Sequence, residues 1–233
     1  MKSHVNWPIF TQTGLDSGML TMLGAVIHNF SEPGEYIGTI LLRDEAVGRF
    51  NLTVDKECPT VQADIDLATL HRPQEASCKD GSQKRYVVNP RGYAVFHVTR
   101  GTGGYAVVIG RLQDKGEAKL AFDSRELNEG DIFAVTMIRP GKYNVTNEKS
   151  DAKAEITVSY PRVGKVPYRP PNPVNIKCTD GRLTPSKIEI QPSQGQVYQI
   201  QTPSRIKIEL VKPIDGPSEQ HQAPRRPRKQ SGK

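Results

Sequence analysis

Hydrophobic and polar residues alternate along much of this chain of 233 residues. The clearest runs are Lys187-Ile188-Glu189-Ile190 and Arg205-Ile206-Lys207-Ile208-Glu209-Leu210. A period of two places apolar side chains on one face of a strand and charged ones on the other, so these runs predict half-buried β-strands. Helical periodicity is scarce, and the best helical segment is Asp64 to Leu70. Because 18 prolines and 20 glycines separate many short runs, the pattern predicts an all-β fold.

Two short sequence signatures each occur twice. Pro33-Gly34-Glu35-Tyr36 returns as Pro140-Gly141-Lys142-Tyr143, and Cys78-Lys79-Asp80-Gly81 returns as Cys178-Thr179-Asp180-Gly181. Repetition at a spacing of about one hundred residues predicts two copies of a folding unit. The signatures alternate along the chain, so the sequence holds one complete unit and two leftover halves at its ends.

This order predicts a division of the chain. Residues 73–160 form a complete β-sandwich, inserted into a split sandwich made of residues 1–57 and 174–213, because each half alone would expose an apolar face and strand edges. Residues 161–173 are rich in proline and predict a stiff linker, and residues 214–233 predict a disordered basic tail. Alternatively, the C-terminal half joins the N-terminal half of a neighbouring chain, which would give a dimer or an open filament.

The repeated motifs resemble those of cupredoxin-like domains. Residues 176–192 resemble the opening of such a domain, and Pro-Gly-x-Tyr followed by a β-rich run, at 50–54 or 156–158, resembles its end. The resemblance implies two Greek-key β-sandwiches. A type 1 copper site needs two His and one Cys with a weak axial ligand, and the family places several of these after the Pro-Gly-x-Tyr strand. Residues 37–40 and 144–147 hold no Cys, His or Met, so we expect no type 1 copper and no cofactor.

The cysteines and histidines offer few metal ligands. Cys78 and Cys178 occupy matching places in the repeat, so we do not expect them to pair with each other; a bridge between Cys58 and Cys78 is one alternative, and buried or free thiols are the other. The five histidines are isolated, with no His-x-His spacing. His97 lies in an alternating strand and is expected to face solvent. His28 precedes the first Pro-Gly turn and is the best single candidate for a metal ligand.

Charge and glycine content point to two further segments. The glycine-rich run 100–105 lacks the Gly-Lys-Ser/Thr ending of a phosphate loop, which favours a flexible turn. Much of the net charge of +7 lies in the tail, whose candidate binding residues for polyanions are Arg225, Arg226, Arg228 and Lys229. No run is apolar enough to cross a membrane, and no signal peptide is visible, so we expect a cytoplasmic protein, or an extracytoplasmic one if the N-terminus has been trimmed.

No paired carboxylates, and no nucleophile with a base, can be brought together from their spacing. The sequence therefore predicts a non-catalytic structural or protein-binding module, not an enzyme, which contacts a protein partner or associates with itself through β-edges. The alternative is a metal-handling or electron-transfer protein related to cupredoxins, with a site that the spacing does not show.

Overall fold

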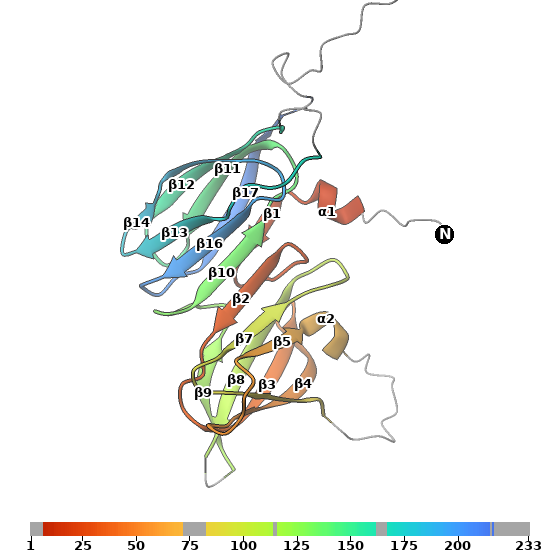
Figure 1. Ribbon diagram of the computed structural model, residues 1–233, viewed down its shortest axis with the longest axis vertical. Helices are drawn as coiled ribbons and strands as arrows, with labels where there is room; N and C mark the ends of the chain where they lie inside the picture. Colours follow the sequence, from red (N-terminus) through yellow and green to blue (C-terminus); the bar gives the residue numbers. More distant parts are fainter. Residues whose placement is uncertain (1–6, 72–82, 114–115, 162–166, 215, 217–233) are drawn as a thin grey trace, which may run out of the picture.

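The computed structural model describes residues 7–71, 83–113, 116–161, 167–214 and 216, and confirms the all-β class (Figure 1). The elements in chain order are α1 (Trp7–Thr11), β1 (Gly14–Asp16), β2 (Gly24–His28), β3 (Gly34–Leu42), β4 (Glu45–Val54), β5 (Gln62–Asp66), α2 (Leu67–Leu70), β6 (Arg85–Val88), β7 (Tyr93–His97), β8 (Tyr105–Leu112), β9 (Ala118–Asp123), β10 (Ile132–Thr136), β11 (Gly141–Asn147), β12 (Lys153–Val158), β13 (Val174–Thr179), β14 (Arg182–Thr184), β15 (Lys187–Ile190), β16 (Gly195–Ile200) and β17 (Ile206–Pro213).

The strands form three sheets, which we name by their places in Figure 1. The central sheet has seven strands in the order β14-β13-β16-β10-β2-β7-β5. The upper sheet has the order β1-β17-β11-β12-β15, and the lower sheet has the order β6-β4-β3-β8-β9. Figure 1 shows the central sheet running past both smaller sheets, so that its two ends cover one sheet each.

The antiparallel pair β2–β10 joins the two ends of the central sheet. Ile27 lies opposite Ile132, and Ala25 lies opposite Ala134. Phe133 of β10 and Val26 of β2 are fully buried and point toward the core. Because this pairing runs over four residue pairs without a register shift, the two ends of the molecule share one hydrogen-bonded layer.

The same pattern of strand pairing occurs on both sides of the β2–β10 pair. The hairpin β3–β4 is followed by β6, parallel to β4, and the hairpin β11–β12 is followed by β15, parallel to β12. β8 then pairs with β3, and β17 pairs with β11. In the central sheet, β5 runs parallel to β7 as β13 runs parallel to β16.

The structure assigns the sequence halves differently from the prediction. Outside their own segment, residues 174–213 pair mainly with β10, β11 and β12. Within the described part of residues 1–57, only the short strand β1 pairs with them, at Leu15 opposite Ile208. The proposed split sandwich and the inserted sandwich at 73–160 are therefore wrong. The N-terminal half pairs with the half that follows it, and the half at residues 132–158 pairs with residues 174–213, so the connections are shorter and no orphan half remains.

The Pro-Gly-x-Tyr signature has a specific structural role. The Tyr36 hydroxyl group donates a hydrogen bond to the Glu32 carbonyl at 2.6 Å, and that of Tyr143 donates to the Arg139 carbonyl at 2.7 Å. Both rings are buried, and burial raises the pKa of both phenols. Such a tyrosine, bonded to the backbone four residues upstream, fastens the loop that enters the strand to the core.

Two local predictions had different outcomes. The glycine-rich run 100–105 is a turn between β7 and β8, with Gly101, Gly103 and Gly104 at positive φ. The predicted helix Asp64 to Leu70 is only partly helical: β5 extends to Asp66, which then caps the four-residue helix α2 by accepting a hydrogen bond from the Ala68 amide. Pairing of β5 with β7 outweighs the weak helical preference of so short a segment.

Candidate functional site

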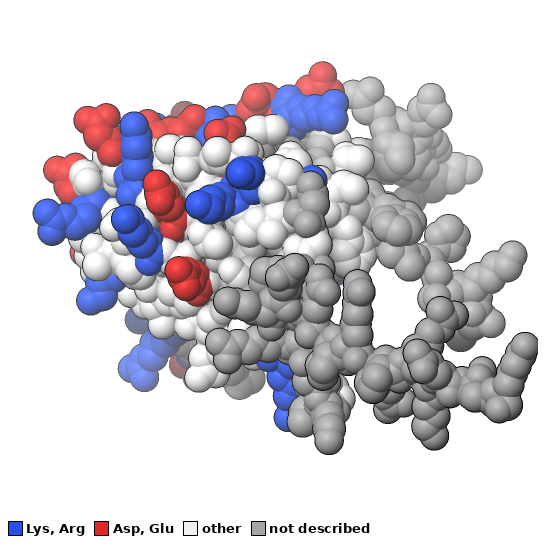
Figure 2. Space-filling view, turned by 90° about the horizontal axis from the view of Figure 1, so that it is seen from above, with Lys and Arg blue, Asp and Glu red and all other residues white. Residues whose placement is uncertain are grey.

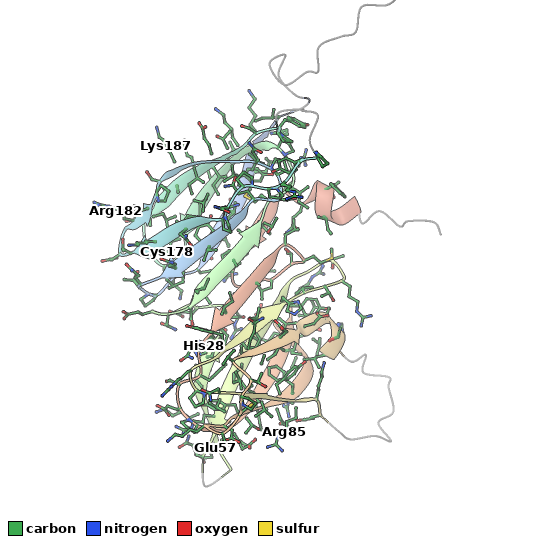
Figure 3. All side chains as sticks on the ribbon, in the orientation of Figure 1. His28, Glu57, Arg85, Cys178, Arg182 and Lys187 are labelled. Atoms are coloured by element: carbon green, nitrogen blue, oxygen red, sulfur yellow. The ribbon has the colours of Figure 1, made fainter. Side chains whose placement is uncertain are left out.

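The outer edge of the upper sheet is formed by β15, a strand with a strict alternation of exposed and buried side chains. Lys187 and Glu189 are exposed, whereas Ile188 and Ile190 are buried against the core. β15 runs parallel to β12 without a bulge, and Ile188 lies opposite Ile156. Figure 3 shows Lys187 at the outer rim of the molecule. We call Lys187, Ile188, Glu189 and Ile190 the β15 edge.

Hydrogen bonds to β12 show which backbone groups of β15 point outward. The amides of Glu155 and Ser159 donate to the carbonyl groups of Ser186 and Ile190, at 2.8 and 2.9 Å. Successive residues of a strand direct their backbone groups to opposite sides, so those of Lys187 and Glu189 point away from β12. Within the described part of the chain, no strand pairs with this side of β15.

The other sheet edges are shorter, acidic or irregular, or, in β6, carry a charged side chain that is already paired within the chain. β1 and β14 have only three residues each. β9 has a register shift opposite Ile109 and Gly110 and exposes Lys119, and both features discourage pairing with another strand. β5 carries Asp64 and Asp66 on its outer face, so a second β5 would meet like charges.

In β6, which corresponds to β15 in the other half of the molecule, the charged side chain of Arg85 is paired within the chain. The Arg85 guanidinium donates to Glu35 at 2.8 Å and to the Thr53 hydroxyl group at 3.0 Å. No ion pair is formed by Lys187 or Glu189 among the described residues, so their charges are free to meet a partner.

His28, the predicted single-ligand candidate, forms a pair that holds the two halves of the molecule together. Its Nδ1 lies 2.5 Å from Oδ1 of Asp131, whose carboxylate is buried and also accepts a hydrogen bond from the Asn128 amide at 2.7 Å. The imidazole stacks on Phe122 with ring centroids 4.3 Å apart. His28 lies at the end of the β2–β10 pair and between the two halves in Figure 3, where its pair with Asp131 serves as a structural contact.

Neither of the two cysteines that the structure describes, Cys58 and Cys178, belongs to a group of metal-ligating side chains. Cys178 is buried in β13, and burial raises the pKa of its thiol to about 12, so it packs as a neutral, apolar side chain. Cys58 carries a free thiol. Cys78, its suggested disulfide partner, lies outside the described residues. Among the residues that the structure describes, no group of three or more His, Cys, Asp or Glu side chains could hold a metal ion.

The other residues singled out in the sequence are His97, the linker and the basic tail, of which only His97 and part of the linker are described. His97 is partly exposed on the outer face of β7, as expected. Of the predicted linker, residues 161 and 167–173 are described, and the Tyr168 hydroxyl group donates to the Pro192 carbonyl at 2.6 Å. The tail residues Arg225, Arg226, Arg228 and Lys229 lie outside the described residues.

Charge over the described surface is mixed. Figure 2, seen from above, shows basic and acidic side chains interspersed over the visible described atoms. Among the helices of the described residues, none is long and apolar enough to span a membrane.

Sequence reasoning found the β15 strand but not its position at an edge. The alternation at 187–190 predicts which side chains are buried, but the same alternation occurs in β17, which is an interior strand of the upper sheet. The short strand length and the nearby Pro185 are the only local signals of an edge.

Comparisons with known proteins identify no relative. Searches against protein-family models, curated proteins and solved structures found no match.

Proposed function

We propose that this protein is a non-catalytic structural or protein-binding module that adds a strand of a protein partner to the β15 edge. The outward backbone groups of Lys187 and Glu189, on a strand without a bulge whose outer side no described strand covers, carry this proposal. Main-chain hydrogen bonds supply affinity in such strand addition, and the alternating side chains supply specificity. The rest of the fold serves as a rigid support, because the shared central sheet links both halves.

The module consists of two cupredoxin-like units without copper ligands. Two observations support this part of the proposal: the same strand pairing occurs on both sides of the β2–β10 pair, and Tyr36 and Tyr143 make the same hydrogen bond to the backbone. Tyrosine corners of this kind are typical of Greek-key sandwiches. The buried, protonated thiol of Cys178 serves packing and not metal binding.

A backbone substitution tests binding at the edge. Glu189→Pro removes one outward amide, and it leaves the bonds to β12 intact because proline is tolerated on the free side of an edge strand. Glu189→Ala, the matched control, removes the same side chain but keeps the amide. Tagged full-length chains are used to capture proteins from an extract that also contains a second copy with a different tag.

Strand addition predicts that some captured protein, or the second copy, is retained by the wild type and Glu189→Ala but lost with Glu189→Pro. Equal capture by all three chains would contradict binding at this edge.

A further inference from the structure

We infer that the β15 edge binds the β15 edge of a second copy, antiparallel, about a two-fold axis that passes by Ile188. This inference rests on the proposed function, because it names the partner of the same edge. A two-fold contact uses one surface patch twice, so that patch must be complementary to itself. β15 meets this requirement in its side chains, its backbone groups and its charges.

The side-chain pattern restricts the register. Residues directly opposite each other in an antiparallel pair point to the same face of the sheet. The buried Ile188, which is 4% exposed, must therefore face an apolar residue of the partner if both cores are to stay covered. Centring the contact on Ile188 places it opposite the partner's Ile188 and places Lys187 opposite the partner's Glu189.

Charge selects this register over its neighbours. A contact centred on Glu189 would place this carboxylate opposite the partner's Glu189, and a contact centred on Lys187 would oppose two lysines. Like charges directly opposite each other destabilise a sheet, whereas opposite charges stabilise it. Lys187 would then lie between Glu155 of β12, its neighbour in the sheet, and the partner's Glu189.

The backbone groups agree with the same register. Those of Lys187 and Glu189 point outward, so each Lys187 and the partner's Glu189 form a hydrogen-bonded pair that exchanges both N–H···O bonds. The two Ile188 residues then form the intervening pair without hydrogen bonds, with Cα atoms about 4.5 Å apart and side chains in close contact. The two upper sheets become one continuous sheet.

The contact is small, because two four-residue strands meet. It lies at the low end of specific interfaces, so the dimer should dissociate on dilution. Each charge reversal changes both symmetry-related pairs, and we therefore expect a loss in affinity of about tenfold or more.

Sedimentation velocity over a concentration series tests the inference with the full chain. Wild-type protein should show a monomer–dimer equilibrium. Lys187→Glu and Glu189→Lys should each be shifted toward monomer by at least about tenfold in the dissociation constant, and the double variant K187E/E189K should dimerise again. Lys153→Glu is the matched control, because Lys153 is an exposed residue of β12, an interior strand of the upper sheet. This variant should dimerise as the wild type does.

A mixture of the two single variants adds an independent readout. Each variant repels itself, but an edge with two acidic side chains should pair with an edge with two basic ones, so the mixture should form a heterodimer. A wild type that stays monomeric at all concentrations, a dimer insensitive to both reversals, or a double variant and a mixture that both fail to associate would overturn the inference. If the wild type is monomeric while Glu189→Pro still abolishes capture of another protein, the inference fails but strand addition at β15 stands.

Discussion

Removal of either corner hydroxyl group should lower the free energy of unfolding by about 1 to 2 kcal/mol. Tyr36 is 3% exposed and Tyr143 is 4% exposed, and each donates a hydrogen bond of 2.6 or 2.7 Å to a backbone carbonyl. A net hydrogen bond contributes about 0.5 to 1.5 kcal/mol, and the carbonyl left without its donor adds part of a desolvation cost. Replacement by phenylalanine keeps the ring and removes only the hydroxyl group.

The two corners lie in opposite halves of the molecule and share no partner, so their effects should add. The double variant should then lose about 2 to 4 kcal/mol, and each single variant should melt about 2 to 8 °C lower, given the dependence expected for a chain of this size. Urea unfolding followed by far-ultraviolet circular dichroism measures these losses. Tyr93→Phe, at a position that is 45% exposed, is the control and should change stability very little.

Losses no larger than that of the Tyr93 control, in both corner variants, would refute the structural role assigned to the signature. A large loss in one corner only would show that the two halves do not use the motif in the same way.

Two further substitutions test the packing of the core. In Gly38→Ala the new Cβ would lie 2.2 Å from a ring carbon of Phe50, so we expect a loss of about 1 to 3 kcal/mol in the free energy of unfolding by urea, whereas Gly14→Ala, where the nearest atom is 3.5 Å away, should be nearly neutral. Burial raises the pKa of the Cys178 thiol to about 12. The buried neutral thiol therefore makes its full contribution to stability below the pKa of an unfolded thiol, near 8.5, and this contribution is lost as the pH rises toward 12. Between pH 8.5 and 9.5 the wild type should therefore lose about 1 kcal/mol more than Cys178→Ala, and parallel pH curves would contradict the burial of this thiol.

Local patterns predicted the all-β class and several strands, because burial on one face repeats at every second residue. The alternation at Lys187 to Ile190 is such a case. The turn at 100–105 was also predictable, since only glycine adopts positive φ without strain.

The pairing of the halves could not be read from the order of the signatures. The predicted division and the observed pairing would each cover the apolar faces of the halves. They differ in which strands pair with each other in the sheets. The ladder from Asn51 to Arg85 and that from Glu155 to Lys187 join segments whose register only the folded chain shows.

The pair His28–Asp131 was missed for a similar reason. Its members lie 103 residues apart, and the Asp131 side chain belongs to no recognisable motif. Sequence reasoning therefore considered His28 alone, as a metal ligand, whereas β2 and β10 bring it to a buried carboxylate.

Amide hydrogen exchange at single-residue resolution, measured by nuclear magnetic resonance in dilute and concentrated samples, tests self-pairing at β15 most directly. If β15 binds a second copy, the outward amides of Lys187 and Glu189 exchange rapidly in the dilute protein and become protected at high concentration, while the amide of Ser159, already bonded to Ile190, changes little. Exchange of the Lys187 and Glu189 amides that stays equally fast while other surface amides become protected would contradict pairing at this edge.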